Sequence, residues 1–152
     1  MSATLVAFGG EVSIAAELLK KSYILDRVYK DTACGQIPLQ NCTHFTIQKI
    51  VEWLEHHNNE DLGKQLKIEK GKPTPKLPKW DKAFFDKLSN TDLLRIVQAA
   101  EYLQIDELST MACRRIADLL RMKPIKQIRS EWNIQTGWTV DEERKHVAMF
   151  AW

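Results

Sequence analysis

The amino-acid sequence predicts a small α/β domain followed by a helical extension, and three observations support this fold class. Segments that favour strand and helix alternate over residues 1–57, which is typical of a small sheet covered by helices. Residues 92–120 carry apolar side chains at three- and four-residue steps on both sides of a short turn, which predicts a pair of helices. Thr139-Val140-Asp141-Glu142 has the form of a capping box and predicts the start of a final helix.

The first elements are expected to be a β-hairpin and a helical stretch. Residues 4–8 and 11–15 favour strand, and Gly9-Gly10 between them permits the positive φ angles of a tight turn. Residues 15–29 then favour helix.

A short strand and a longer helix follow. Ile37-Pro38-Leu39 predicts an extended segment at a sheet edge, because proline has no amide hydrogen to give to a neighbouring strand. Residues 43–57 predict a helix with a broad apolar face and Trp53 alongside it. The face comprises Phe45, Ile47, Ile50, Val51 and Leu54.

Residues 58–79 form a stretch with few apolar residues, three prolines and the basic run KIEKGKPTPKLPK. This composition predicts an exposed linker. Two interpretations of its lysines remain open: a solvated connection between packed parts, or a strip that docks an acidic partner.

The helix pair in residues 92–120 is the most strongly patterned part of the chain. Ser89 lies three residues before Asp92, so its hydroxyl is expected to accept a hydrogen bond from a first-turn amide. The apolar face of the first helix comprises Leu93, Ile96, Val97, Ala100 and Leu103, and that of the second comprises Leu108, Met111, Ala112, Ile116 and Leu119.

The C-terminal hexapeptide VAMFAW, residues 147–152, has no charged side chain. On a helix these residues cover all sides, whereas a terminal helix can bury only part of its circumference against its own domain. Either the tail folds back on the core, or its aromatic residues and Met149 anchor a partner, as such residues do at interfaces.

No pattern in the sequence predicts catalysis or a metal centre. The four histidines, at positions 44, 56, 57 and 146, are expected on helix surfaces or ends, and no nucleophile elbow or phosphate-binding glycine loop accompanies them. The adjacent His56 and His57 are expected to point to different sides of a helix. Cys34, Cys42 and Cys113 lack zinc spacing and are expected to be reduced structural thiols. We therefore predict no enzyme, no cofactor and no metal.

The net charge of +2 and the pI of about 8.4 are too balanced to predict a nucleic-acid partner. No apolar run approaches the length of a membrane span, and MSATLVAFGG lacks the features of a signal peptide. The expected location is cytoplasmic and nuclear.

Several ordered segments resemble one family. AAEYLQIDEL, TMACRRIADLL, KPIKQIRSEWNI and the acidic final helix ending at Trp152 look like the Skp-type adaptors (S-phase-kinase-associated proteins) of SCF ubiquitin ligases. IPLQNCTHFTIQKIVEWLEHH resembles the middle of that family, and LPKWDKAFF its Pro-x-Trp-Asp-x-x-Phe segment. One departure is the lysine-rich linker, where relatives usually carry an acidic loop.

The resemblance implies a BTB/POZ-like fold with a C-terminal helical extension. The expected divisions are residues 1–58 and 80–121 as the two halves of the BTB/POZ domain, 59–79 as the basic linker, and 122–152 as F-box-binding helices. It also implies a non-catalytic adaptor that bridges an F-box substrate receptor to a cullin.

The same resemblance suggests which residues face each partner. The F-box-binding candidates are Leu108, Met111, Ile116, Leu119, Ile125, Ile128, Ile134, Trp138 and Trp152. About half of the aliphatic members are expected to belong to the core instead. The cullin-binding candidates are Glu101, Tyr102, Lys49 and Trp53, and Glu101 stands where the family commonly has asparagine.

The alternative is a BTB/POZ self-association and protein-interaction module that does not bind a cullin. Either reading leaves room for a weak homodimer of the unbound chain. A lysine-rich linker that binds nucleic acid would be a lower-ranked alternative, with an affinity that falls steeply with salt.

Overall fold

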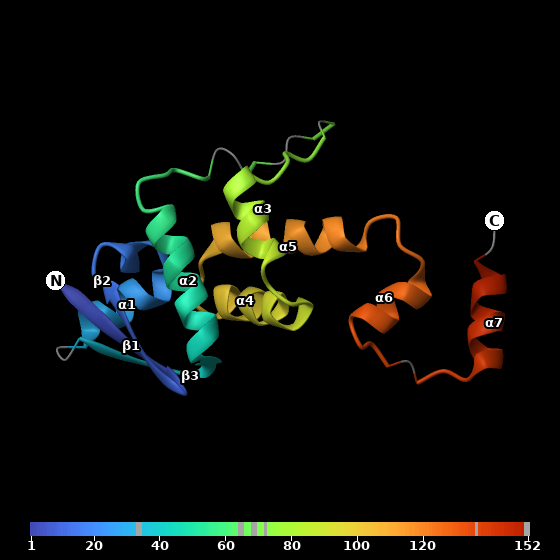
Figure 1. The fold of residues 1–152 in the computed structure, drawn as a ribbon, viewed down its shortest axis with the longest axis horizontal. Coiled ribbons are helices and arrows are strands. Elements are labelled where there is room, and N and C mark those ends of the chain that lie inside the picture. Colours follow the sequence, from blue (N-terminus) through green and yellow to red (C-terminus); the bar gives the residue numbers. More distant parts are fainter. Residues whose placement is uncertain (33–34, 64–65, 68–69, 72, 136, 151–152) are drawn as a thin grey trace. The chain divides into compact units, whose positions relative to one another are not determined.

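The structure is a computed structural model, and it describes residues 1–32, 35–63, 66–67, 70–71, 73–135 and 137–150. The chain divides into two compact units, Met1–Arg121 and Met122–Trp152. In chain order its elements are β1 (Ser2–Phe8), β2 (Gly10–Ala15), the 3-10 helix η1 (Leu18–Lys21), α1 (Tyr23–Asp31), β3 (Gln36–Thr43), α2 (His44–His56), α3 (Lys79–Asp86), α4 (Asn90–Tyr102), α5 (Asp106–Leu120), α6 (Ile125–Glu131) and α7 (Val140–Met149) (Figure 1). The predicted fold class, a small sheet with helices followed by C-terminal helices, is confirmed.

The sheet has the strand order β2-β1-β3. β1 pairs with β2 antiparallel through the predicted hairpin, and Gly9 in the turn adopts a φ of 97°, which disfavours residues with a Cβ atom. β1 pairs with β3 in parallel, so the chain crosses over between them through η1 and α1. β3 lies at an edge, as Pro38 predicts, but it continues to Thr43 and is therefore longer than expected.

One face of the sheet forms the core of the first unit. Leu5 of β1, Ile14 of β2 and Ile37 of β3 are all at most 2% exposed. The buried face of α2 contacts all three strands (Figure 1). Each such aliphatic side chain contributes about 1.5–3 kcal/mol when it is fully removed from water.

Polar caps set where the first helices begin. The Ser22 hydroxyl accepts a hydrogen bond from the Leu25 amide and starts α1, and it donates to the Leu103 carbonyl at the end of α4. Residues 15–21 were predicted as helix, but only Leu18–Lys21 form a short 3-10 helix, because β2 runs to Ala15 and Ser22 starts α1. Thr43 caps α2 in the same way as Ser22 caps α1.

The predicted helix pair is confirmed as α4 and α5, which lie side by side (Figure 1). Ser89 caps α4 by accepting from the Asp92 amide at 3.1 Å, as the spacing predicted. The turn between the helices is short, because Gln104 takes a left-handed φ of 53° and the Ile105 amide donates to the Ala100 carbonyl at 2.9 Å.

The described residues between α2 and α3 form no helix or strand. Leu62 is nevertheless fully buried and anchors the start of this linker, a contact that the sequence reading did not include. Lys21 Nζ also donates to the Glu60 carbonyl at 2.8 Å, and Arg114 Nη2 donates to the Leu66 carbonyl at 2.6 Å.

The second unit contains α6 and α7. Pro124 precedes α6, and Thr139 starts α7 with the predicted capping box. α7 ends at Met149 with Phe150 as its C-cap, so the helix is shorter than predicted, and residues 151–152 lie outside the described residues. Among the helices that the structure describes, none combines the length and the apolar composition needed to cross a bilayer.

Candidate interaction surfaces

The nine F-box-binding candidates differ in how accessible they are. Leu108 and Met111 are fully buried in the first unit, so their side chains offer nothing to a partner in this structure. Ile116 and Leu119 of α5 and Ile128 of α6 are half-buried. Ile125, Ile134 and Trp138 are exposed, and Trp152 lies outside the described residues.

The described residues of the second unit form no buried core. Every described residue from 122 to 150 is half-buried or exposed, although several are large and apolar. The most exposed are Met122, Ile125, Ile134, Val140, Val147, Met149 and Phe150, each more than half exposed. Soluble proteins seldom expose apolar side chains in such density unless a partner covers them.

An ion pair joins the two helices of this unit, and ring contacts connect the residues at and around α7. Arg129 of α6 forms an ion pair with Glu143 of α7. The imidazole of His146 lies in edge contact with Trp138, 4.5 Å between ring centroids, and with Phe150, 4.9 Å between centroids. These contacts orient an aromatic row along α7 and leave much of it open to solvent.

Local hydrogen bonds hold two surface carboxylates of this unit in their charged form. Bonds from Lys123 and Gln127 lower the pKa of Glu131 below its ordinary value. The Thr139 backbone amide and hydroxyl donate to Glu142, and these bonds lower the pKa of that carboxyl as well. The capping box of α7 is therefore strongest when Glu142 is ionised.

The cullin-binding candidates Glu101 and Tyr102 lie at the C-terminal end of α4. Both are exposed, Tyr102 by 48%. The carboxylate of Glu101 accepts a hydrogen bond from the Ser109 hydroxyl on α5. The negative charge that glutamate brings to this position therefore has a polar neighbour. Lys49, on α2, is 26% exposed and forms an ion pair with Glu52 at 2.6 Å.

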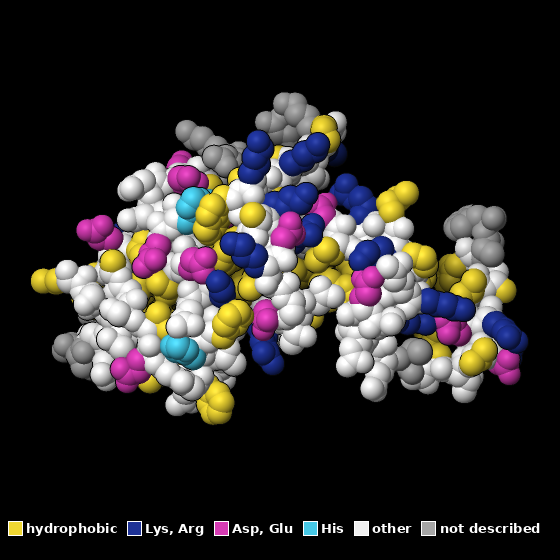
Figure 2. All heavy atoms as spheres, viewed as in Figure 1, with side chains coloured by type: hydrophobic (Ala, Val, Ile, Leu, Met, Phe, Trp, Pro, Cys, Tyr) yellow, Lys and Arg dark blue, Asp and Glu magenta, His cyan; other side chains and the backbone are white. Residues whose placement is uncertain are grey.

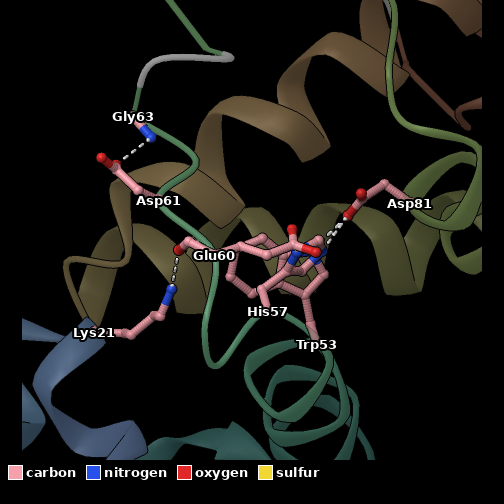
Figure 3. A network of polar contacts seen from close by, with 7 residues as sticks. All are labelled: Lys21, Trp53, His57, Glu60, Asp61, Gly63 and Asp81. Carbon is pink, nitrogen blue, oxygen red and sulfur yellow. Dashed lines mark hydrogen bonds and ion pairs between the residues drawn. The ribbon is translucent and has the colours of Figure 1, made fainter.

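Trp53 is the one cullin-binding candidate whose side chain lies in the core, at 0% exposure. Its indole N–H donates to Asp81 Oδ1 at 2.8 Å, and His57 Nε2 lies 3.0 Å from the same oxygen (Figure 3). Asp81 is itself fully buried at the start of α3. Trp53 therefore fastens α3 to α2 and is not available to a cullin, which corrects the prediction.

His57 lies at the end of α2, as the sequence predicted, but its side chain is buried, at 2% exposure. It follows the last residue of α2, and its Nδ1 lies 2.7 Å from Glu60 Oε2 on the linker (Figure 3). His56, His57 and Glu60 have ligand-type atoms within 4.8 Å of one another. Both ring nitrogens of His57 already contact carboxylates, which leaves neither free as a metal ligand in this arrangement.

A hollow of about 350 Å³ next to Tyr102 contains residues that the sequence reading missed. Arg95 and Gln98 of α4 line it together with Tyr102, and Asn41 and Thr43 line it from the end of β3. Positions 95, 98 and 102 share one face of α4, opposite the apolar face. The polar face of α4 could have pointed to Arg95 and Gln98 in the sequence. The position of the end of β3 beside this face is known only from the fold.

The described cysteines form no disulfide. Cys42 and Cys113 are both free thiols, and burial raises the pKa of the Cys42 thiol. Cys42 therefore behaves as a small apolar side chain under the hollow beside Tyr102. Cys34 lies outside the described residues.

Comparison with known proteins gives these surfaces a context. Residues 106–152 match the Skp1 family, dimerisation domain, and this stretch contains all nine F-box-binding candidates. The chain is 29% identical over 138 residues to "E3 ubiquitin ligase complex SCF subunit sconC" of Arthroderma benhamiae, covering 89% of this chain and 84% of the relative. It is 26% identical over 137 residues to the protein of the same name from Neosartorya fischeri, covering 89% of this chain and 86% of the relative.

The first unit is a small α/β domain, and the second unit is helical and exposes large apolar side chains, which is typical of a protein-interaction module. The matches confirm the resemblance predicted from the sequence: residues 106–152 are similar to the Skp1 family, and most of the chain is similar to proteins named as SCF subunits.

Proposed function

We propose that this chain is a non-catalytic adaptor subunit of an SCF-type E3 ubiquitin ligase. The observation that supports the proposal best is the second unit, which exposes its large apolar side chains and buries none of its described residues. That unit lies within the stretch similar to the Skp1 family, dimerisation domain, and the similar proteins are named as SCF subunits.

The second unit and the C-terminal half of α5 would bind the F-box of a substrate receptor. The half-buried Ile116 and Leu119 of α5 and the exposed Trp138 and Phe150 offer apolar and aromatic side chains. Aromatic anchors that lose all contact with water supply most of the binding energy of an interface, typically 2 kcal/mol or more each. A unit without a core of its own would gain much of its order from the same contact.

The end of α4 would bind the cullin. Tyr102 would be the anchor, with Arg95 and Gln98 beside it around the hollow. Two partners held at once would raise the effective concentration of a bound substrate near the ligase, without a reaction on this chain. The expected sites of action are the cytoplasm and the nucleus.

The proposed binding of an F-box segment can be tested with two matched substitutions. Phe150→Asp places a carboxylate in the exposed apolar surface of the second unit, where Phe150 is 59% exposed. Phe8→Asp makes the same chemical change at the end of β1, where Phe8 is 78% exposed. The full-length chain and the Phe8→Asp variant should co-purify with an F-box segment, and the Phe150→Asp variant should not. A folded full-length chain that recruits no F-box segment would overturn the proposal.

A further inference from the structure

The lysine-rich linker meets α5 at a groove whose residues differ from those proposed to bind the F-box or the cullin. Residues 64–79 contain six lysines and one glutamate. Figure 2 shows Lys and Arg side chains gathering around the linker and α3 in the upper part of the view. This concentration of charge contrasts with the net charge of only +2 for the whole chain.

The groove has two walls of different kinds. It encloses about 490 Å³ between residues 73–77 and one face of α5. The linker wall carries Pro73 and Pro75, and prolines make an extended segment stiff before any ligand binds. The α5 wall is formed by Arg114, Ala117, Asp118 and Arg121, whose steps of three and four place them on one helix face.

Three of the groove's side chains are cations and one is an anion. Arg114 Nη2 donates to the Leu66 carbonyl, which ties the linker to α5, and Arg114 Nε is buried without a partner among the described residues. Arg121 is 69% exposed, and its ion pair with Asp118 is long, at 3.7 Å. Lys76 is exposed and has no ion-pair partner in the part of the chain that the structure describes. Positive charge in the groove therefore exceeds what its own carboxylate neutralises.

We propose that this groove binds an extended acidic segment of a partner protein, with two carboxylates about three residues apart. Arg114 and Arg121 are seven residues apart on α5, or about 10 Å along the helix axis. In the polyproline II form an extended peptide advances about 3.1 Å per residue with three residues per turn, so side chains three residues apart lie on one face, about 9 Å apart, and match this spacing. Lys76 on the opposite wall adds a third positive contact.

The position of Asp118 favours an acidic peptide over a nucleic acid. Asp118 lies between Arg114 and Arg121 on the same face of α5. A peptide can place uncharged residues opposite this carboxylate and keep its acidic residues for the two arginines. A nucleic-acid strand carries a charge at every phosphate and would bring one of them against Asp118.

The test uses the full-length chain and a fluorescently labelled peptide of glycine and serine with two aspartates three residues apart. Lys76→Glu and Arg121→Glu reverse charges inside the groove, whereas Lys20→Glu makes the same change on the exposed surface of η1. Fluorescence anisotropy at low salt should show binding to the unsubstituted chain and to Lys20→Glu. Binding should be roughly tenfold weaker or worse for each groove variant, because like charges face each other there. Circular dichroism establishes that each variant is folded.

Added salt should weaken the interaction, and a peptide with lysines in place of the aspartates should not bind. The proposal is overturned if the acidic peptide does not bind the unsubstituted chain, or if the groove variants bind as well as Lys20→Glu does. A single-stranded oligonucleotide that binds more tightly than the peptide, with the same loss in the groove variants, would also overturn the assignment to an acidic protein segment.

Discussion

Replacing Asp81 with alanine should be among the most destabilising single changes in the first unit. The Asp81 carboxylate is fully buried, and one of its oxygens accepts from the Trp53 indole at 2.8 Å and contacts His57 Nε2 at 3.0 Å. The substitution would leave the polar nitrogens of Trp53 and His57 buried without this partner. It would also remove the only described side-chain hydrogen bonds that join α3 to the end of α2.

The magnitude follows from these two contacts. A buried polar group left without a partner costs about 1–3 kcal/mol, and breaking a buried charged network by removing one member costs about 3–5 kcal/mol. We expect Asp81→Ala to lower the free energy of unfolding by about 3–5 kcal/mol. That is a large part of the 5–15 kcal/mol typical of a domain.

Urea unfolding followed by tryptophan fluorescence measures this loss. Asp86→Ala is the matched control, because Asp86 is on the same helix, is 41% exposed and pairs with Arg115 at 2.6 Å. A surface pair of this kind contributes about 0–1 kcal/mol. The Trp53→Phe and Asp81→Ala changes should also be non-additive, because they remove the same hydrogen bond. A loss below about 1 kcal/mol for Asp81→Ala, or one equal to that of the control, would refute the reasoning.

Three further predictions concern the two surfaces. Trp138→Ala, which truncates a half-exposed aromatic residue, should weaken binding to an F-box segment by about 1–3 kcal/mol in isothermal titration calorimetry without changing the unfolding of the first unit. Tyr102→Ala should weaken cullin binding at least about tenfold in a biosensor assay and leave F-box binding unchanged, and equal losses for both partners would argue against two separate surfaces. The lowered pKa of Glu142 means that its capping of α7 is present above the ordinary glutamate pKa and is lost as the pH falls through the lowered value, so α7 should lose helicity in acid. Glu142→Gln should remove that part of the acid transition in circular dichroism, and an unchanged acid profile would contradict the capping role.

Much of the first unit followed from local patterns in the sequence. Hydrophobic periodicity predicted α2, α4 and α5, and serine or threonine at the right spacing predicted the caps at Ser89 and Thr139. The two-glycine turn predicted the hairpin. These features depend on residues that are neighbours in the chain, so the local sequence is enough to predict them.

The misplaced residues depend on contacts between distant segments. Trp53 continues an amphipathic helix and could have faced a partner, but Asp81, 28 residues further on, gives its indole a buried acceptor. His57 ends the same helix and is buried because Glu60 of the linker and Trp80 and Asp81 of α3 lie against its ring. The groove beside α5 likewise needs the linker and the helix to meet, which no spacing in the sequence predicts.

The central claim is that one chain binds an F-box segment and a cullin through separate surfaces. The most direct measurement compares the full-length chain with a version ending at Lys145, each mixed with an F-box segment and the N-terminal region of a cullin and analysed by size-exclusion chromatography with light scattering. The account predicts a three-component complex for the full-length chain and a complex with the cullin alone for the shortened chain. A full-length chain that is folded yet binds neither partner would contradict it.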